Sequence, residues 1–182
     1  SWSMSNSLFS SGLRVQAAVK RKVFVSYHHG GDQVYYNAFS RAFHDTYEVI
    51  TDNSLERQID SEDVEYVMRR IRENYITGSS CTIVLVGKDT YARKYVDWEI
   101  KATLDAGHSL IGVQLPTLSI NAQGFVTAPE RLNDNINSGY ALWLTWADIT
   151  RSPQTCQAYI EAANAKNKRL IDNTRARRLR NG

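Results

Sequence analysis

Hydrophobic residues along the chain form short runs separated by longer stretches with helical spacing. The runs predict buried β-strands at residues 21–27, 47–51, 81–86, 108–115 and 140–146. The run CTIVLV at residues 81–86 contains no charged residue and is dominated by branched side chains. That pattern is typical of a central parallel strand that is covered on both faces.

Between the predicted strands, apolar residues recur at the three- and four-residue spacing of an α-helix. Helices are expected to begin at Asp32 and Ser61, each acting as an N-cap, to cover residues 88–106 up to Gly107, and to begin again at Pro153. Residues 116–139 lack a clean period and predict a long loop with at most a short helical turn. Strict alternation of strand and helix predicts an α/β fold: a single doubly wound, five-stranded parallel sheet with helices on both faces.

Chain length favours one domain. A chain of 182 residues can bury a substantial core but is short for two domains. We expect a flexible N-terminal segment at residues 1–19, the folded domain at residues 20–172 and a basic C-terminal tail at residues 173–182. Met4 suggests that residues 1–3 are a remnant of expression.

Composition argues against several classes of protein. No run approaches the roughly 20 apolar residues that cross a bilayer, and the opening lacks the layout of a signal peptide, so a cytoplasmic protein with no membrane contact is expected. Cys81 and Cys156 lie far apart, which predicts two buried thiols in a reducing compartment. His28 and His29 are adjacent and far in sequence from other histidines, so no metal site is predicted.

Positive charge is concentrated near the end of the chain. Residues 164–182 hold seven Lys or Arg and one acid. Such a segment could contact nucleic acid, but no aromatic residue follows Tyr159 to stack on bases, so nucleic acid is not the expected partner. The favoured interpretation is a solvated helix end that fades into disorder.

Candidate chemistry is expected outside the carboxyl ends of the strands, where the winding of the sheet reverses. This rule selects the loops after the first three strands and the start of the third helix. The loop HHGGD at residues 28–32 matches no standard phosphate-binding motif, although its backbone amides could favour an anion.

The third helix carries the most informative stretch, YVDWEI at residues 95–100. At about 100° per residue, Tyr95 and Glu99 share one flank of the buried stripe, Asp97 lies on the other flank and Trp98 points outward. A carboxylate at the rim of a cleft can hydrogen-bond a sugar hydroxyl and stabilise positive charge at an anomeric carbon.

The periodicity of this helix alone favours a simpler interpretation of Glu99. A solvated glutamate paired with Arg93 or Lys101 fits the same pattern, and the partner acid of an ordinary glycosidase is missing. From the residues alone, Glu99 is therefore only a candidate.

Two motifs resemble the Toll/interleukin-1 receptor (TIR) domains. The strand that ends in Ser-Tyr at residues 26–27 and the string G-x-x-T-Y-x-x-x-x-V-x-x-E-I at residues 87–100 are fairly specific when taken together. The resemblance covers residues 20–115 and is greatest to the bacterial TIR-like branch that includes the cyclase subunit of Thoeris anti-phage defence. The flavodoxin-like fold of that family agrees with the predicted sheet.

The resemblance implies an enzyme that takes NAD as its substrate and needs no cofactor. TIR enzymes cleave NAD between nicotinamide and ribose with a glutamate on the third helix, and Glu99 occupies the matching position. Residues matched to the nucleotide pocket are Phe24, Ser26, Tyr27, His28, Asp52, Ser54 and Tyr95, with Phe24 and Tyr27 expected near the base or nicotinamide. The family often has Trp-Cys where this chain has Tyr95 and Val96, so the aromatic residue is kept in kind only.

The product implied by the Thoeris branch is a cyclised or conjugated ADP-ribose that signals to a separate effector protein. Many TIR domains instead act as non-catalytic interaction modules, and an outward Trp98 would suit self-association or binding to other TIR-like domains. A flavodoxin-like receiver shares the architecture, but it would need clustered acids for Mg²⁺ after the first strand, where only Asp32 stands.

Overall fold

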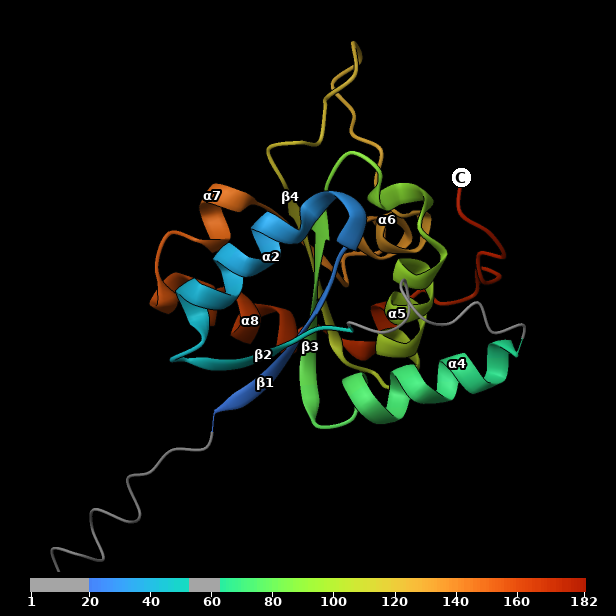
Figure 1. Cartoon of the computed structure of the whole chain (residues 1–182), viewed down its shortest axis with the longest axis horizontal. Coiled ribbons are helices and arrows are strands. Elements are labelled where there is room, and N and C mark those ends of the chain that lie inside the picture. Colours follow the sequence, from blue (N-terminus) through green and yellow to red (C-terminus); the bar gives the residue numbers. More distant parts are fainter. Residues whose placement is uncertain (1–19, 53–62) are drawn as a thin grey trace, which may run out of the picture.

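A five-stranded parallel sheet organises the protein, which confirms the predicted architecture (Figure 1). The computed structural model describes residues 20–52 and 63–182, so the predicted N-terminal segment lies outside the described residues. The strands are β1 (Arg21–Ser26), β2 (Tyr47–Ile50), β3 (Ser79–Val86), β4 (Ser109–Gln114) and β5 (Leu142–Thr145). Their order is β2-β1-β3-β4-β5, and every neighbouring pair is parallel. All five strands were predicted, with boundaries that differ by one or two residues.

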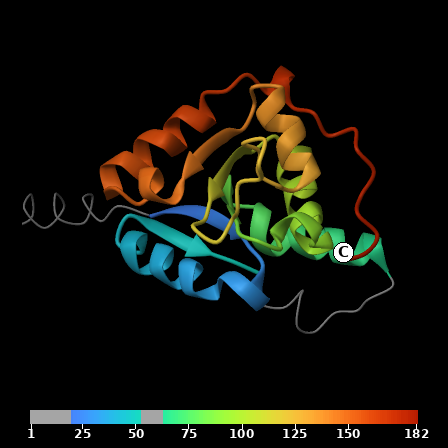
Figure 2. The same cartoon turned by 90° about the horizontal axis from the view of Figure 1, so that it is seen from above.

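Helices cover both faces of the sheet (Figures 1 and 2). One face packs against α2 (His29–Phe43), α7 (Trp146–Ile149) and α8 (Pro153–Asn164), and the other packs against α4 (Val64–Ile71), α5 (Lys94–Asp105) and α6 (Glu130–Asn137). A π-helical turn, Arg72–Ile76, continues α4. In the part of the chain that the structure describes, no helix is long and apolar enough to cross a bilayer.

Three helix starts differ from the prediction or lie outside the described residues. α5 begins at Lys94 rather than at residue 88, after a 3-10 turn at Thr90–Ala92. α2 begins at His29 rather than at Asp32. Asp32 is buried inside the helix, where its φ of −122° and ψ of 15° produce a kink. Ser61 lies outside the described residues, and Asp63 caps α4 by accepting a hydrogen bond from the Tyr66 amide at 3.1 Å. Gly107, with a φ of +69°, follows the end of α5 as predicted, because this left-handed conformation favours glycine.

The segment at residues 116–139 is not entirely a loop, since α6 occupies its second half. Pro129 precedes the helix, and Leu132 packs into the core beside α5. The apolar period was hidden because two of the buried positions, Arg131 and Asn135, are polar. Polar residues at buried positions can be recognised only from their partners, which come from distant parts of the chain.

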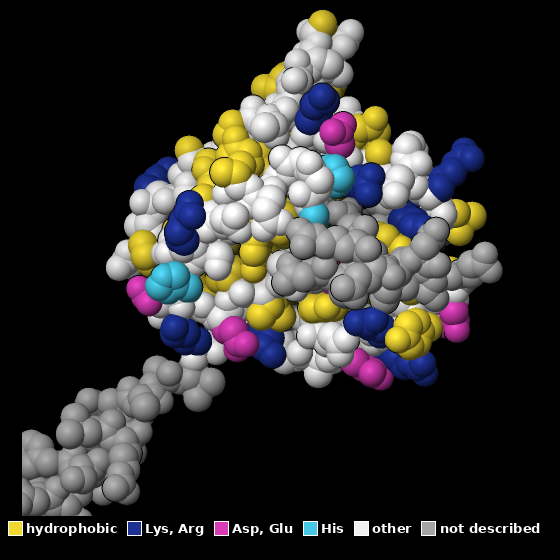
Figure 3. Space-filling view, viewed as in Figure 1, with side chains coloured by type: hydrophobic (Ala, Val, Ile, Leu, Met, Phe, Trp, Pro, Cys, Tyr) yellow, Lys and Arg dark blue, Asp and Glu magenta, His cyan; other side chains and the backbone are white. Residues whose placement is uncertain are grey.

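The first half of this segment projects beyond the sheet as a loop, residues 116–128, with apolar side chains near its tip (Figure 3). The Asn121 side chain closes the turn by accepting hydrogen bonds from the amides of Gln123 at 3.0 Å and Phe125 at 2.9 Å. Gly124 supplies the positive φ of +86° that the turn requires. Ile120 and Phe125 remain 61% and 69% exposed at this tip.

Both cysteines are free and buried, as predicted. Burial raises the pKa of the Cys81 and Cys156 thiols to about 12. Because the thiolate is the reactive form, we expect neither thiol in the native protein to react with an aromatic disulfide reagent at pH 8, whereas both should react in denaturant. Fast labelling of either thiol without denaturant would contradict this burial.

Candidate active site

The winding of the sheet reverses between β1 and β3, and the residues that follow these two strands build the candidate site. The chain leaves β1 into α2 on one face and leaves β3 toward α5 on the other face. Ligands of parallel sheets bind at such a reversal, outside the carboxyl ends of the strands. Glu99 of α5 lies beside the last residue of β1, Ser26, and so belongs to this region.

Glu99 is buried rather than solvated, with an exposed fraction of 5%. The Ser26 hydroxyl donates a hydrogen bond of 2.7 Å to Glu99 Oε1. The interpretation of Glu99 as a solvated surface acid is wrong, because the side chain is buried, and the Lys101 ammonium pairs with Asp105 at 3.2 Å. A buried carboxylate must be stabilised by hydrogen bonds or charge, and Ser26 supplies one such contact.

The backbone around Glu99 is also held in place. Thr103, one turn further along α5, donates its hydroxyl to the Glu99 carbonyl at 2.8 Å. The same hydroxyl lies 2.7 Å from the hydroxyl of Thr82 on β3. Both threonines are fully buried, so this contact fixes the position of the Glu99 backbone relative to β3.

Aromatic side chains surround this end of α5. Phe24 is fully buried and stacks on Tyr75, with ring centroids 5.7 Å apart. Tyr95 belongs to the same apolar cluster and meets the Trp98 ring edge-on at 5.4 Å. The sequence-predicted residues Phe24, Ser26, Tyr95 and Glu99 therefore come together on one face of the sheet.

Tyr27 lies on the opposite face, so the structure does not bring it beside Phe24 as expected. Neighbouring residues of a strand point to opposite faces, and Phe24 and Tyr27 are three positions apart. The Tyr27 ring stacks between His29 and Tyr36, with centroid distances of 4.3 and 4.8 Å. Its hydroxyl donates to Gln33 Oε1 at 2.8 Å, so Tyr27 packs beneath α2.

The loops that follow β1 and β2 carry the other predicted residues. His28 is the N-cap of α2, and its ring lies against Gly30, where an added Cβ would stand 2.9 Å from His28 Cε1. Asp52 follows β2 and is buried, next to Thr51, whose hydroxyl donates to the Val25 carbonyl at 2.7 Å. Ser54 lies outside the described residues.

Asp32 is a site residue that the sequence interpretation missed. It is 3% exposed, burial raises the pKa of its carboxyl group, and it accepts a hydrogen bond from the Thr90 hydroxyl at 3.4 Å. That hydroxyl also accepts from the Gly87 amide at 2.9 Å, and any side chain at Gly87 would collide with the Asp32 carboxylate. Only the glycine directly after the central strand hinted at this close approach. Within the described ranges, no three His, Cys, Asp or Glu side chains are arranged to hold a metal ion.

Asp97 and Trp98, which precede Glu99, are both buried, so the prediction of an outward Trp98 is wrong. Asp97 forms an ion pair with the fully buried Arg131 of α6, with Nε and Oδ1 2.9 Å apart. Trp98 is 3% exposed, and its indole N–H donates to the carbonyl of Arg178 at 2.7 Å. The C-terminal segment covers the helix face that periodicity alone assigns to solvent.

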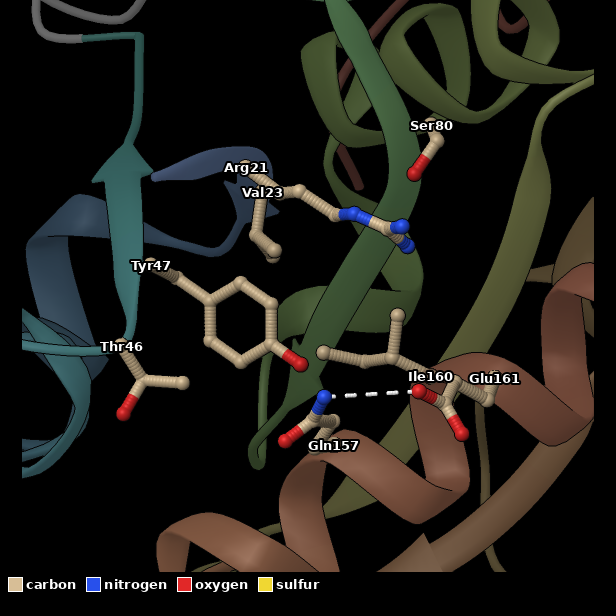
Figure 4. A pocket seen from close by; sticks show the side chains of 8 residues that line it. All are labelled: Arg21, Val23, Thr46, Tyr47, Ser80, Gln157, Ile160 and Glu161. Atoms are coloured by element: carbon tan, nitrogen blue, oxygen red, sulfur yellow. Dashed lines mark hydrogen bonds between the residues drawn. The ribbon is translucent and has the colours of Figure 1, made fainter. Parts of the chain in front are cut away.

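A separate cavity of about 140 Å³ lies at the amino ends of the strands (Figure 4). Arg21 and Tyr47 line it together with residues of α8, where Gln157 donates to Glu161 Oε1 at 3.4 Å. Burial is the main cause that raises the pKa of Tyr47 to about 12. Ligands of parallel sheets bind at the carboxyl ends, so this cavity is not part of the candidate site.

Comparison with known families covers the same part of the chain. Residues 24–120 match the family described as "Thoeris protein ThsB, TIR-like domain". The chain belongs to this Thoeris TIR-like family. The matched range runs from β1 past β4 and includes Phe24, Ser26 and Glu99, so the TIR-like domain contains the region described above. A search of curated proteins finds no match.

The buried pair of Asp97 and Arg131 predicts a strong effect on the stability of the TIR-like domain. Substituting Arg131→Met should lower the free energy of unfolding by about 3–5 kcal/mol, because it leaves the Asp97 carboxylate buried without its cation. Urea denaturation followed by Trp fluorescence measures the change. Arg169→Ala, at an exposed arginine, serves as the control and should change it by less than about 0.5 kcal/mol. Equal stability of the two variants would contradict the prediction.

Proposed function

We propose that this TIR-like domain cleaves NAD at the bond between nicotinamide and ribose, with Glu99 as the catalytic residue. The observation that carries the proposal is a buried carboxylate, held by Ser26 at 2.7 Å, at the reversal point of the sheet. Membership of the Thoeris TIR-like family supports the same assignment. Phe24 and Tyr95 are proposed to shape the nucleotide pocket, and His28, Asp52 and Ser54 are proposed to contribute to nucleotide binding.

A single carboxylate is sufficient for this reaction. Nicotinamide is bound to ribose as a cationic pyridinium, so when the C–N bond breaks, the electron pair leaves with a neutral group that needs no proton. A general acid, which an ordinary glycosidase must supply, is therefore unnecessary. Glu99 would hydrogen-bond a ribose hydroxyl and stabilise the positive charge that develops on the sugar ring.

The nucleophile that captures the ADP-ribosyl cation decides the product. A hydroxyl or ring nitrogen of the same nucleotide gives a cyclic ADP-ribose, and a second molecule gives a conjugate. We propose a product of this kind as the signal to a separate effector protein in anti-phage defence. Two free, buried thiols suit a reducing compartment, which supports a cytoplasmic location.

A non-catalytic interaction module is the second candidate function. Trp98 no longer supports it, because its side chain is covered. The observation that favours it is the projecting loop, whose Ile120 and Phe125 are exposed on a turn that its own hydrogen bonds hold closed. Exposed apolar side chains of this kind are typical of contacts with other proteins, including further TIR-like domains.

The first test compares two substitutions of the same chemical type. Glu99→Gln should lower the rate of nicotinamide release from NAD by roughly 100-fold or more, because the neutral amide cannot stabilise the developing cation. Glu73→Gln, at an exposed residue of the π-helical turn, should retain the wild-type rate. Liquid chromatography measures nicotinamide, and mass spectrometry of the nucleotide identifies the product. Equal rates for the two variants, or no release by the wild type, would favour the interaction module.

Ser26 provides a second, graded test. Ser26→Ala removes the hydrogen bond to the Glu99 carboxylate. Because hydrogen bonds to charged groups contribute about 1.5–3 kcal/mol, we expect kcat for NAD cleavage to fall by roughly tenfold to 100-fold. Ser26→Thr keeps a hydroxyl and should recover part of the rate. Steady-state kinetics measure both, and an unchanged kcat in Ser26→Ala would remove Ser26 from the site.

A further inference from the structure

The last residues of the chain form an extended segment that crosses the helices on one face of the sheet. After a short 3-10 turn, Lys168–Leu170, residues 171–182 pass along α6 and α5 toward α4 (Figures 1 and 2). We call this segment the C-terminal strap. The expected solvated helix end is wrong, because α8 stops at Asn164 and the strap makes side-chain and backbone contacts along its length.

The strap is first anchored on α6 by paired contacts. Asn135 and Asp172 exchange two hydrogen bonds, from the Asn135 amide to the Asp172 carbonyl at 2.8 Å and from the Asp172 backbone amide to Asn135 Oδ1 at 2.9 Å. The Arg175 guanidinium then binds both carboxylate oxygens of Asp134, at 2.8 and 2.9 Å. Bidentate pairs of this kind fix the orientation of the strap on α6 and also stabilise its contact with that helix.

The middle of the strap completes the surroundings of a buried charge. Arg131 of α6 donates to the carbonyls of Arg175 at 2.8 Å and Ala176 at 3.2 Å, in addition to its contact with Asp97. A buried guanidinium needs acceptors for its donors. Two of those acceptors are backbone atoms of the strap, so the ion pair that orders α5 is completed only when the strap is in place.

Arg178 grips the two residues that precede Glu99. Its backbone amide donates to Asp97 Oδ2 at 2.8 Å, and its carbonyl accepts the indole N–H of Trp98 at 2.7 Å. Its side-chain Nε donates to the Ala92 carbonyl at 3.2 Å, just before α5 begins. Arg178 therefore contacts both the residue Ala92, which precedes α5, and the first turns of α5 itself.

The end of the strap supplies the missing cap of α5. The N-cap residue Arg93 makes no side-chain capping bond. The Asn181 side chain takes that role by accepting from the Lys94 amide at 2.9 Å, and the Gly182 amide donates to the Ala92 carbonyl at 3.1 Å. An orphan amide at a helix start is thus satisfied by a residue far away in sequence.

We propose that the C-terminal strap positions Glu99 for catalysis. This inference rests on the proposed function. Glu99 can stabilise the transition state only if α5 holds its carboxylate in a fixed position relative to the substrate. The strap holds the start of that helix on the side away from the sheet. Loosening the strap should lower kcat for NAD cleavage and leave KM nearly unchanged, because the contacts described above act on the helix that carries Glu99.

The test uses two matched pairs of variants in the full chain. Arg178→Ala removes the contact with the Ala92 carbonyl, while Arg180→Ala changes an exposed arginine of the same strap. Asn181→Ala removes the cap, while Asn181→Asp keeps an oxygen acceptor at the helix start. Hydrogen–deuterium exchange of residues 92–99 reports the hold on α5, and nicotinamide release reports catalysis.

We expect exchange at the start of α5 to become about threefold to tenfold faster in Arg178→Ala and Asn181→Ala, with kcat reduced by a similar factor. Arg180→Ala and Asn181→Asp should behave like the wild type in both measurements. Equal exchange within each pair would overturn the strap's role, and so would faster exchange with an unchanged kcat. If the wild type releases no nicotinamide, the proposed function fails, and the exchange comparison alone then decides whether the strap holds α5.

Discussion

The buried ion pair between Asp97 and Arg131 is the contact on which the arrangement around α5 depends. Burying two charges costs several kcal/mol per ion, and the cost is offset only when every donor and acceptor finds a partner. Here the partners come from α5, α6 and the C-terminal strap at once. The pair therefore requires three distant parts of the chain to meet in one geometry, two residues before Glu99 on α5.

The alternation of side chains along β1 divides the candidate site from the core beneath α2. Phe24 and Ser26 point toward α5, whereas Val25 and Tyr27 pack under α2. The Ser26 hydroxyl can consequently reach Glu99, while the Tyr27 ring is held by stacking on the far side. Two adjacent residues of one motif thus have different tasks, one at the carboxylate and one in the packing that supports the loop after β1.

Sequence patterns predicted most of the sheet because its signals are local. A run such as CTIVLV is explained by burial alone, and alternation with helices leaves few possible topologies. Glu99 was identified as a candidate because its position on α5 and its motif agree. The burial of Glu99 could not be predicted from the helical pattern of α5, because the Ser26 hydroxyl that contacts it belongs to β1, far away in the sequence.

The features that the sequence did not predict share a physical cause: buried polar groups whose partners lie far away in the chain. Arg131 and Asn135 are polar residues at buried positions, so α6 lacks a clear apolar period. Periodicity predicts that Trp98 is exposed, whereas the strap covers it. The sequence predicts Asp32 as a helix cap, whereas in the structure its carboxylate lies directly beside Gly87. Hydrophobic periodicity shows which face of a helix is mostly apolar. It gives no information about a polar face that another polar segment of the chain covers.

Two of the seven positive charges near the end of the chain, those of Arg175 and Arg177, are paired with acids within the fold. Arg175 pairs with Glu130 and Asp134, and Arg177 pairs with Glu65 at 3.0 Å. Exposed pairs of this kind weaken as salt shortens the Debye length, whereas the buried Asp97 is screened much less. Added salt should therefore weaken the exposed ion pairs of Arg175 and Arg177 while the contacts of the strap with Asp97 persist. The exposed side of the strap would loosen before its buried side.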